Sequence, residues 1–231
     1  MTTIIIATIG EWNIENYFLL KKTFSNKYNF VLLTNPNELT KESLNKLMPK
    51  YIFFPHWSWI IPSEIHQNYE CIGFHMTDLP YGRGGSPFQN LIMQEHYSTK
   101  ISALKIEKGL DTGDIYLQKD LDISIGSAEE NFMKISKIIF EEMIPQFLST
   151  IPTARPQQGD ITTFKRREPR ESDIKTLQAK QLYKIYDFIR MLDAEGYPKA
   201  FFQLENFKIE LSEVHKKNNR LTGRFEVKEN E

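Results

Sequence analysis

A histidine, a loop rich in proline and glycine, and an acidic turn lie close together in this sequence. The apolar run CIGF at 71–74 is followed by HMTDLPYGRGGSPFQNLI at 75–92, and GLDTGDIYLQ follows at 109–118. Histidine can accept and donate a proton near neutral pH, so it is a common general acid and base. The glycines allow the loop backbone to approach a ligand closely. We therefore predict an active site around His75.

The elements that position this region read as an alternation of strands and helices. A buried strand over 71–74 would place His75 at its carboxyl end, where ligands bind in open α/β sheets. Further strands are predicted over 3–9, 29–35, 51–54, 100–107 and 115–123, and helices after 13–16, over 41–48, and from 86 to 97. The strand at 100–107 alternates apolar and polar residues, which predicts a half-solvated strand.

The second half of the chain begins with the longest predicted helix, over 127–151. Ser127 at its N-cap and Glu130 at N3 form a capping box. We predict an α/β fold: a Rossmann-like, open, mostly parallel sheet flanked by helices, with a small C-terminal helix plus β-strand appendage. The expected division is a core over 1–151, an extended connecting segment over 152–175, and a C-terminal helix and β-hairpin region over 176–231.

Bulk composition limits the classes of partner. The chain has 231 residues, 40% of them hydrophobic and 26% charged, and a net charge of −1. It therefore has no general electrostatic field favouring nucleic acid, and we expect no nucleic-acid partner. No signal peptide and no apolar run of bilayer length is visible, so we expect no membrane association. The single Cys71 fits a reducing compartment, which predicts a cytoplasmic protein; a homodimer is left open.

At these motifs the chain resembles the formyltransferases that use N10-formyltetrahydrofolate. The family pattern is roughly Asn-x-His-x-Ser/Thr-x-Leu-Pro, then a glycine-rich loop with Arg-Gly and a Pro, then Asp-x-Gly-Asp/Ala-Ile. The matching residues are His75, Thr77, Leu79, Pro80, Arg83, Gly84, Pro87, Asp111, Gly113, Asp114 and Ile115. The stretch 52–65 resembles the strand and loop that cradle the folate pteridine. The stretch 185–204 resembles the segment after the core in formyltransferases acting on nucleotide-linked amino sugars.

The resemblance implies formyl transfer from N10-formyltetrahydrofolate to a primary amine. His75 would act as the acid and base and Asp111 would orient it, by the logic of acid–base triads. One position departs from the pattern: the catalytic Asn of the family stands two residues before the histidine, and here that residue is Gly73. Attack on the formyl group generates an oxyanion that needs a donor. Gln89 and Asn90 are the nearby amides expected to replace the missing Asn.

The remaining site residues are expected on either side of this centre. Trp57 and Trp59 would form a wall for a flat pterin, since ligand pockets are largely apolar. Folate contacts are predicted at Trp57, Trp59, Ile60, Ile61, Arg83, Gly84, Leu110 and Asp114, and substrate contacts at Gly10, Trp12, Asn13, Thr77 and Tyr197. No metal site is expected, because the histidine spacings match no zinc signature.

The choice of amine follows from charge and from analogy. The family includes enzymes for methionyl-tRNA and for nucleotide-linked amino sugars, and the tRNA enzymes usually carry a basic surface and a further β-barrel. The net charge of −1 therefore favours a nucleotide-linked amino sugar, such as a 4-amino-4,6-dideoxy sugar used in surface glycans or in a pseudaminic-acid-type pathway. The alternatives are a methionyl-tRNA or other amine formyltransferase, and a non-catalytic folate-binding relative.

Overall fold

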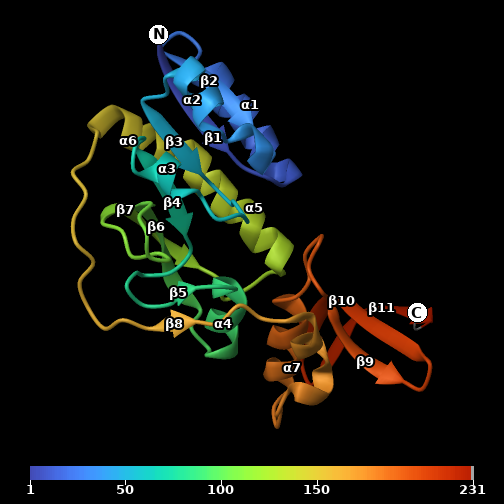
Figure 1. The fold of residues 1–231 in the computed structure, drawn as a ribbon. Helices are drawn as coiled ribbons and strands as arrows, with labels where there is room; N and C mark the ends of the chain where they lie inside the picture. The colour runs from blue at the N-terminus through green and yellow to red at the C-terminus, as the bar shows by residue number, and fades with distance from the viewer. Residues whose placement is uncertain (230–231) are drawn as a thin grey trace. The chain divides into compact units, whose positions relative to one another are not determined.

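The predicted open sheet is present and holds six strands (Figure 1). The computed structural model describes residues 1–229 and orders these strands β2-β1-β3-β4-β6-β7. Strand β1 pairs in parallel with β2 and β3, β3 pairs in parallel with β4, and β4 pairs antiparallel with β6. Their bounds are β1 (Thr2–Ala7), β2 (Tyr28–Leu33), β3 (Tyr51–Phe54), β4 (Cys71–His75), β6 (Ser98–Lys105) and β7 (Ile115–Asp122). The predicted mostly parallel α/β fold is confirmed.

The other elements connect these strands or follow them in the chain. The helices are α1 (Glu11–Phe24), α2 (Lys41–Leu47), α3 (Ser63–His66), α4 (Pro87–Met93), α5 (Ala128–Ile138), α6 (Ile144–Thr150) and α7 (Leu182–Arg190). Short helical turns are η1 (Pro36–Glu38), the π turn η2 (Ile139–Met143), η3 (Pro169–Ser172) and η4 (Ile174–Thr176). The remaining strands are β5 (Arg83–Gly84), β8 (Thr163–Phe164), β9 (Ala200–Leu204), β10 (Phe207–Lys217) and β11 (Arg220–Glu229). Strands β9, β10 and β11 form the predicted C-terminal sheet.

The parallel strands contribute side chains to two apolar layers. On one face, Ile5, Ile52 and Cys71 are buried in a cluster that also contains Leu44 and Ile65. On the other, the rings of Tyr51 and Phe53 meet Phe147 of α6 edge-on, with centroids 5.1 and 5.2 Å apart. Because successive strand residues point to opposite faces, continuous β-branched and aromatic runs fill both layers. These layers hold the strand ends, and hence His75, in fixed register.

Two compact units interleave along the sequence. One comprises residues 1–83, 100–121 and 133–163, and the other comprises residues 84–99, 122–132 and 164–231, of which the structure describes those up to 229. The six-stranded sheet lies almost entirely in the first unit, and the three-stranded sheet lies in the second. The consecutive boundaries expected at 151 and 175 stay a prediction.

The long helix expected over 127–151 is interrupted. The capping box is confirmed, because Ser127 N donates to Glu130 Oε2 at 2.8 Å and Glu130 N donates to Ser127 Oγ at 3.2 Å. The helix then passes through η2 before α6 begins. Pro145 has no N–H to bond the carbonyl four residues earlier, and a proline inside a helix forces such a local rearrangement.

Other expectations need adjustment at particular elements. Strand β6 is not half-solvated, because Ile101, Ser102, Ala103 and Leu104 are buried in succession. It lies between β4 and β7 in the sheet. Helix α4 ends at Met93, so it is shorter than the helix predicted from 86 to 97. Among the described residues, no helix is long and apolar enough to cross a bilayer.

Candidate active site at the carboxyl end of β4

His75 ends strand β4, and both nitrogens of its ring face oxygen atoms. Its Nε2 lies 2.8 Å from the Gly82 carbonyl oxygen, and its Nδ1 lies 3.5 Å from Asp111 Oδ2. The imidazole is buried, with 8% of the residue exposed. A ring held at both nitrogens keeps one orientation, which a general acid and base requires. The structure thus brings together the two residues that the sequence motifs single out, while their catalytic roles stay predictions.

Asp111 reaches His75 from an irregular loop between β6 and β7. Its φ of 53° lies in the left-handed region, which is uncommon outside glycine but tolerated by Asp. Two residues on, a Cβ at Gly113 would overlap the Lys105 carbonyl oxygen, so only glycine fits there. Gly113 is therefore a backbone requirement of the loop that carries Asp111.

An extended segment between α6 and β8, which we call the strap (residues 152–162), holds both loops that contact His75 (Figure 1). Arg83 donates through Nε and Nη2 to Gln157 Oε1, at 3.1 and 2.7 Å. Gln157 Nε2 donates in turn to the carbonyl oxygens of Asp111 and Gly113, each at 2.8 Å. Gly82 N donates to Thr162 Oγ1 at 2.6 Å. Sequence reasoning missed Gln157 and Thr162, because they lie far from the motifs in the chain.

Gly73 lies on β4 against apolar side chains. A Cβ at this position would stand 3.3 Å from Ile106 Cγ1 and 3.7 Å from Leu104 Cδ2. The space into which a residue-73 side chain would point is therefore lined by hydrocarbon. Neither neighbour can donate a hydrogen bond in place of a carboxamide.

The predicted replacement donors, Gln89 and Asn90, belong to α4 in the second unit. The Gln89 side chain is buried and its Nε2 donates to the Met191 carbonyl at 3.1 Å. Asn90 Nδ2 lies 3.0 Å from the carbonyl oxygens of Gly85, Ser86 and Lys165. Both amides thus make structural bonds within their own unit, and an oxyanion role for either stays a prediction. Tyr197, also in this unit, packs against Phe132 with ring centroids 5.3 Å apart.

The predicted folate wall follows β3. The rings of Trp57 and Trp59 meet edge-on with centroids 4.8 Å apart, and Trp57 also packs on Phe54. Trp57 Nε1 is buried and has no hydrogen-bond partner among the described residues. Ile61 packs against the core, whereas Ile60 is 95% exposed. An unpaired buried N–H beside flat rings fits a ligand with a polar edge.

The other predicted contacts differ in how freely a ligand could reach them. Leu110 is 69% exposed, and the Asp114 carbonyl accepts from Lys105 N at 2.9 Å. Asn13 is buried and its Nδ2 donates to the Ile9 carbonyl at 2.8 Å. Thr77 is buried too, with its Oγ1 3.4 Å from the Gly82 carbonyl, so it supports the loop that His75 contacts.

The N-terminal end of α1 brings an aromatic ring to the same edge of the sheet. Gly10, with φ 88°, precedes the helix, and the ring of Trp12 lies 6.1 Å from that of His56. Burial lowers the pKa of His56 below its ordinary value, because the charged form loses hydration. His56 is therefore a neutral ring at physiological pH and suits an apolar wall.

The described residues offer no support for a cysteine nucleophile or for a metal centre. Burial raises the pKa of the Cys71 thiol to about 12, with a smaller contribution from Glu70, so the thiolate nucleophile is scarce. Within residues 1–229, no three His, Cys, Asp or Glu side chains are grouped so as to hold a metal ion.

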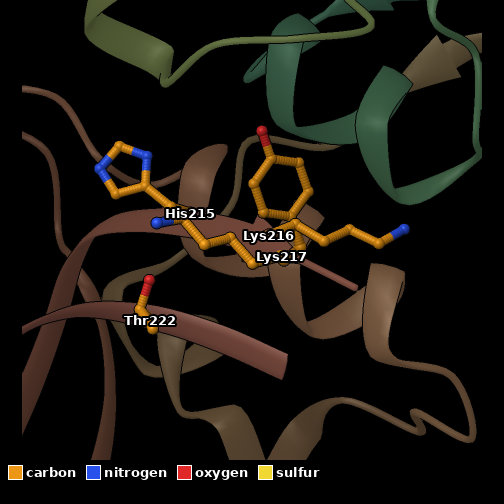
Figure 2. A pocket seen from close by; sticks show the side chains of 5 residues that line it. His215, Lys216, Lys217 and Thr222 are labelled. Atoms are coloured by element: carbon orange, nitrogen blue, oxygen red, sulfur yellow. The ribbon is translucent and has the colours of Figure 1, made fainter. Parts of the chain in front are cut away.

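A hollow in the second unit is lined by cationic side chains. It measures about 520 Å³ and is bordered by Tyr186, His215, Lys216, Lys217 and Thr222 (Figure 2). Lys216 and Lys217 end β10, and in the hairpin register Lys217 stands opposite Arg220. Within the described chain, these three cations have no carboxylate partner within 4.0 Å. We call Lys216, Lys217 and Arg220 the hairpin tip; it is a local positive site on a chain of net charge −1.

Comparison with known proteins identifies the family. The profile described as methionyl-tRNA formyltransferase, C-terminal domain, matches residues 169–228. A solved structure described as methionyl-tRNA formyltransferase from Clostridium thermocellum is 50% identical, with a TM-score of 0.96, and the match covers 99% of this chain and 100% of that one. The chain belongs to the formyltransferase family, with a core like that of methionyl-tRNA formyltransferases.

More distant relatives agree on the fold. A methionyl-tRNA formyltransferase from Caldicellulosiruptor saccharolyticus is 32% identical over 150 residues, which cover 61% of this formyltransferase and 47% of that protein. The chain thus spans about half the length of the curated relatives it matches. A sugar N-formyltransferase from a Shewanella species has a TM-score of 0.72 but only 14% identity, and shows the fold alone.

These findings correct two predictions. The expected nucleotide-linked amino-sugar substrate and the expected absence of a nucleic-acid partner are wrong, because the relatives of higher identity are methionyl-tRNA formyltransferases. Net charge was a poor basis for judging RNA affinity, because it averages over the whole surface and does not report local clusters of cations.

Proposed function

We propose that this formyltransferase moves a formyl group from N10-formyltetrahydrofolate to the α-amine of methionyl-tRNA. The observation that carries the proposal is the contact of 3.5 Å between His75 and Asp111 at the end of β4. The full-length similarity to a methionyl-tRNA formyltransferase supports the choice of amine. A cytoplasmic site of action belongs to this proposal and is supported by the single unpaired Cys71.

The residues of the site divide the chemistry between them. An amine must be neutral to attack a formyl carbon, and it loses a proton as the new N–C bond forms. His75 accepts that proton and returns it to the departing N10 nitrogen. Asp111 fixes the ring orientation and stabilises the imidazolium that forms between these two steps. The thiol of Cys71 takes no part, because it is buried and protonated.

The loop after β3 would hold the formyl donor. Trp57 and Trp59 supply apolar surface, and the unpaired Nε1 of Trp57 can meet a polar edge of the pterin. Ile60, Ile61, Arg83, Gly84, Leu110 and Asp114 complete the proposed folate contacts. On the amine side, the proposal assigns Gly10, Trp12, Asn13, Thr77 and Tyr197.

The hairpin tip supports an RNA substrate. Cations without a carboxylate partner are available to phosphates, whose contacts supply much of the affinity of proteins for nucleic acid. Lys216 and Lys217, labelled in Figure 2, offer such groups, and Tyr186 also lines the hollow.

A second candidate function is folate binding without turnover, and Gly73 favours it. The apolar contacts of that position leave no oxyanion donor there. Loss of one such donor typically costs about 10²–10³-fold in kcat, which slows an enzyme but does not abolish its activity.

The test is formylation of methionyl-tRNA by the wild type and by variants of the pair. His75→Ala should lower kcat at least about 10²-fold, and Asp111→Asn should also lower it severely. His66→Ala, which removes a histidine on α3 outside the site, is the matched control and should keep wild-type kcat. Near wild-type turnover in a folded His75→Ala protein would refute the proposed role of His75.

A further inference from the structure

Gln157 makes a bond with every group that its carboxamide offers. Its single oxygen accepts twice from the Arg83 guanidinium, and its two N–H groups reach the carbonyls of Asp111 and Gly113. A carboxamide has two N–H donors, so both donors are used. Together these bonds to guanidinium and carbonyl partners fix the side chain in one rotamer.

The partners of Gln157 are the two loops that flank the His75 ring. The Asp111 carboxylate faces Nδ1 of that ring, and Gly82, next to Arg83, supplies the carbonyl at Nε2. The rest of the strap also ties these loops. Arg155 and Ile115 exchange two backbone bonds of 2.8 and 2.9 Å, and Arg83 N donates to the Thr162 carbonyl at 3.0 Å.

Gln157 bonds the backbone at the tip of the Asp111 loop. Leu110 and Thr112 on either side of Asp111 are exposed, and Asp111 itself has a left-handed φ of 53°. Such a conformation persists only where the surroundings determine it. The two bonds from Gln157 Nε2 act on the backbone of this turn, at Asp111 and at Gly113.

We propose that Gln157 is a positioning residue: its carboxamide locks the Asp111 loop to the Arg83 loop and so sets the geometry of the His75–Asp111 pair. The catalytic part of this inference rests on the proposed formyl transfer. The structural part, that Gln157 holds the Asp111 loop, is independent of the proposed formyl transfer. Misplacement of a catalytic group by about 1 Å can cost up to 10²-fold in rate.

The test compares Gln157→Ala with Gln158→Ala, a control at the neighbouring, exposed glutamine of the same strap. Gln157→Ala should lower kcat for methionyl-tRNA by about 10-fold to 10²-fold with little change in KM. Gln157→Glu should lose as much, because it still accepts from Arg83 but cannot donate to the two carbonyls. Gln158→Ala should match the wild type.

Two further measurements separate positioning from general damage. In an Asp111→Asn background, Gln157→Ala should change kcat by less than about 2-fold, since residues that act through one another are non-additive. An equal loss in both backgrounds would overturn the inference. Amide hydrogen exchange at Ile115, whose N–H bonds Arg155, should accelerate in Gln157→Ala but not in Gln158→Ala.

The exchange measurement also distinguishes failure of this inference from failure of the proposed function. If the wild type formylates no methionyl-tRNA, the proposed function fails, and faster exchange around Ile115 in Gln157→Ala still supports the locking role. If exchange is unchanged, or if an active enzyme keeps its kcat without the Gln157 side chain, the locking role is refuted.

Discussion

At the scale of single residues, Gly73 separates this chain from the family pattern most sharply. A side chain there would meet Ile106 at 3.3 Å, closer than a well-packed core accommodates without movement. Glycine in place of the family's Asn therefore does more than remove a hydrogen-bond donor. The hydrocarbon side chain of Ile106 lines the place that the Asn carboxamide would occupy.

This packing predicts the outcome of restoring the amide. Gly73→Asn alone should destabilise the fold by about 1–3 kcal/mol, the usual cost of overpacking. Adding Ile106→Ala should relieve the overlap and let the new carboxamide turn toward the ligand, so kcat should rise above that of Ile106→Ala alone. Thermal melts and steady-state kinetics measure both effects, with Ile106→Ala as the control. A double variant no faster than that control would argue that the oxyanion donor already exists elsewhere.

At the scale of elements, sequence patterns predicted the strands but not the role of the strap. Continuous apolar runs such as 3–9 and 51–54 predict buried parallel strands, and the capping box at Ser127 fixes a helix start to the residue. The prediction of a half-solvated strand over 100–107 was wrong, because Ser102, a polar residue of its apolar–polar alternation, is buried. Gln157 has no local signal at all: its partners lie 46 and 74 positions away in the chain, and only the fold brings them together.

The C-terminal hairpin carries a prediction at this same scale. The double variant Lys216→Ala, Lys217→Ala should bind methionyl-tRNA more weakly than the wild type. The slope of log K against log salt concentration should also become shallower, by about 1 for each phosphate that is no longer neutralised. Lys228→Ala is the matched control, because Lys228 on β11 is already paired with Glu210 at 2.8 Å. Titrations at several salt concentrations measure the slopes. Identical slopes for the wild type and the double variant would show that the hairpin tip does not bind the RNA.

At the scale of the whole molecule, net charge was the weakest guide and the motifs were the strongest. A formal charge of −1 led to the expectation of a sugar nucleotide, although a few unpaired cations on one hairpin are compatible with an RNA partner. The His75, Asp111 and Gly-rich loop motifs led to the formyltransferase family, because together they match its sequence pattern. Substrate choice depends on surfaces that no motif encodes.

One assay tests the central claim most directly. Purified wild-type protein is given N10-formyltetrahydrofolate with methionyl-tRNA, and in parallel with a panel of nucleotide-linked amino sugars, and the formylated products are quantified. The account predicts formyl-methionyl-tRNA as the product, with the rate falling at least about 10²-fold in His75→Ala. Formylation of an amino sugar with none of methionyl-tRNA would contradict it.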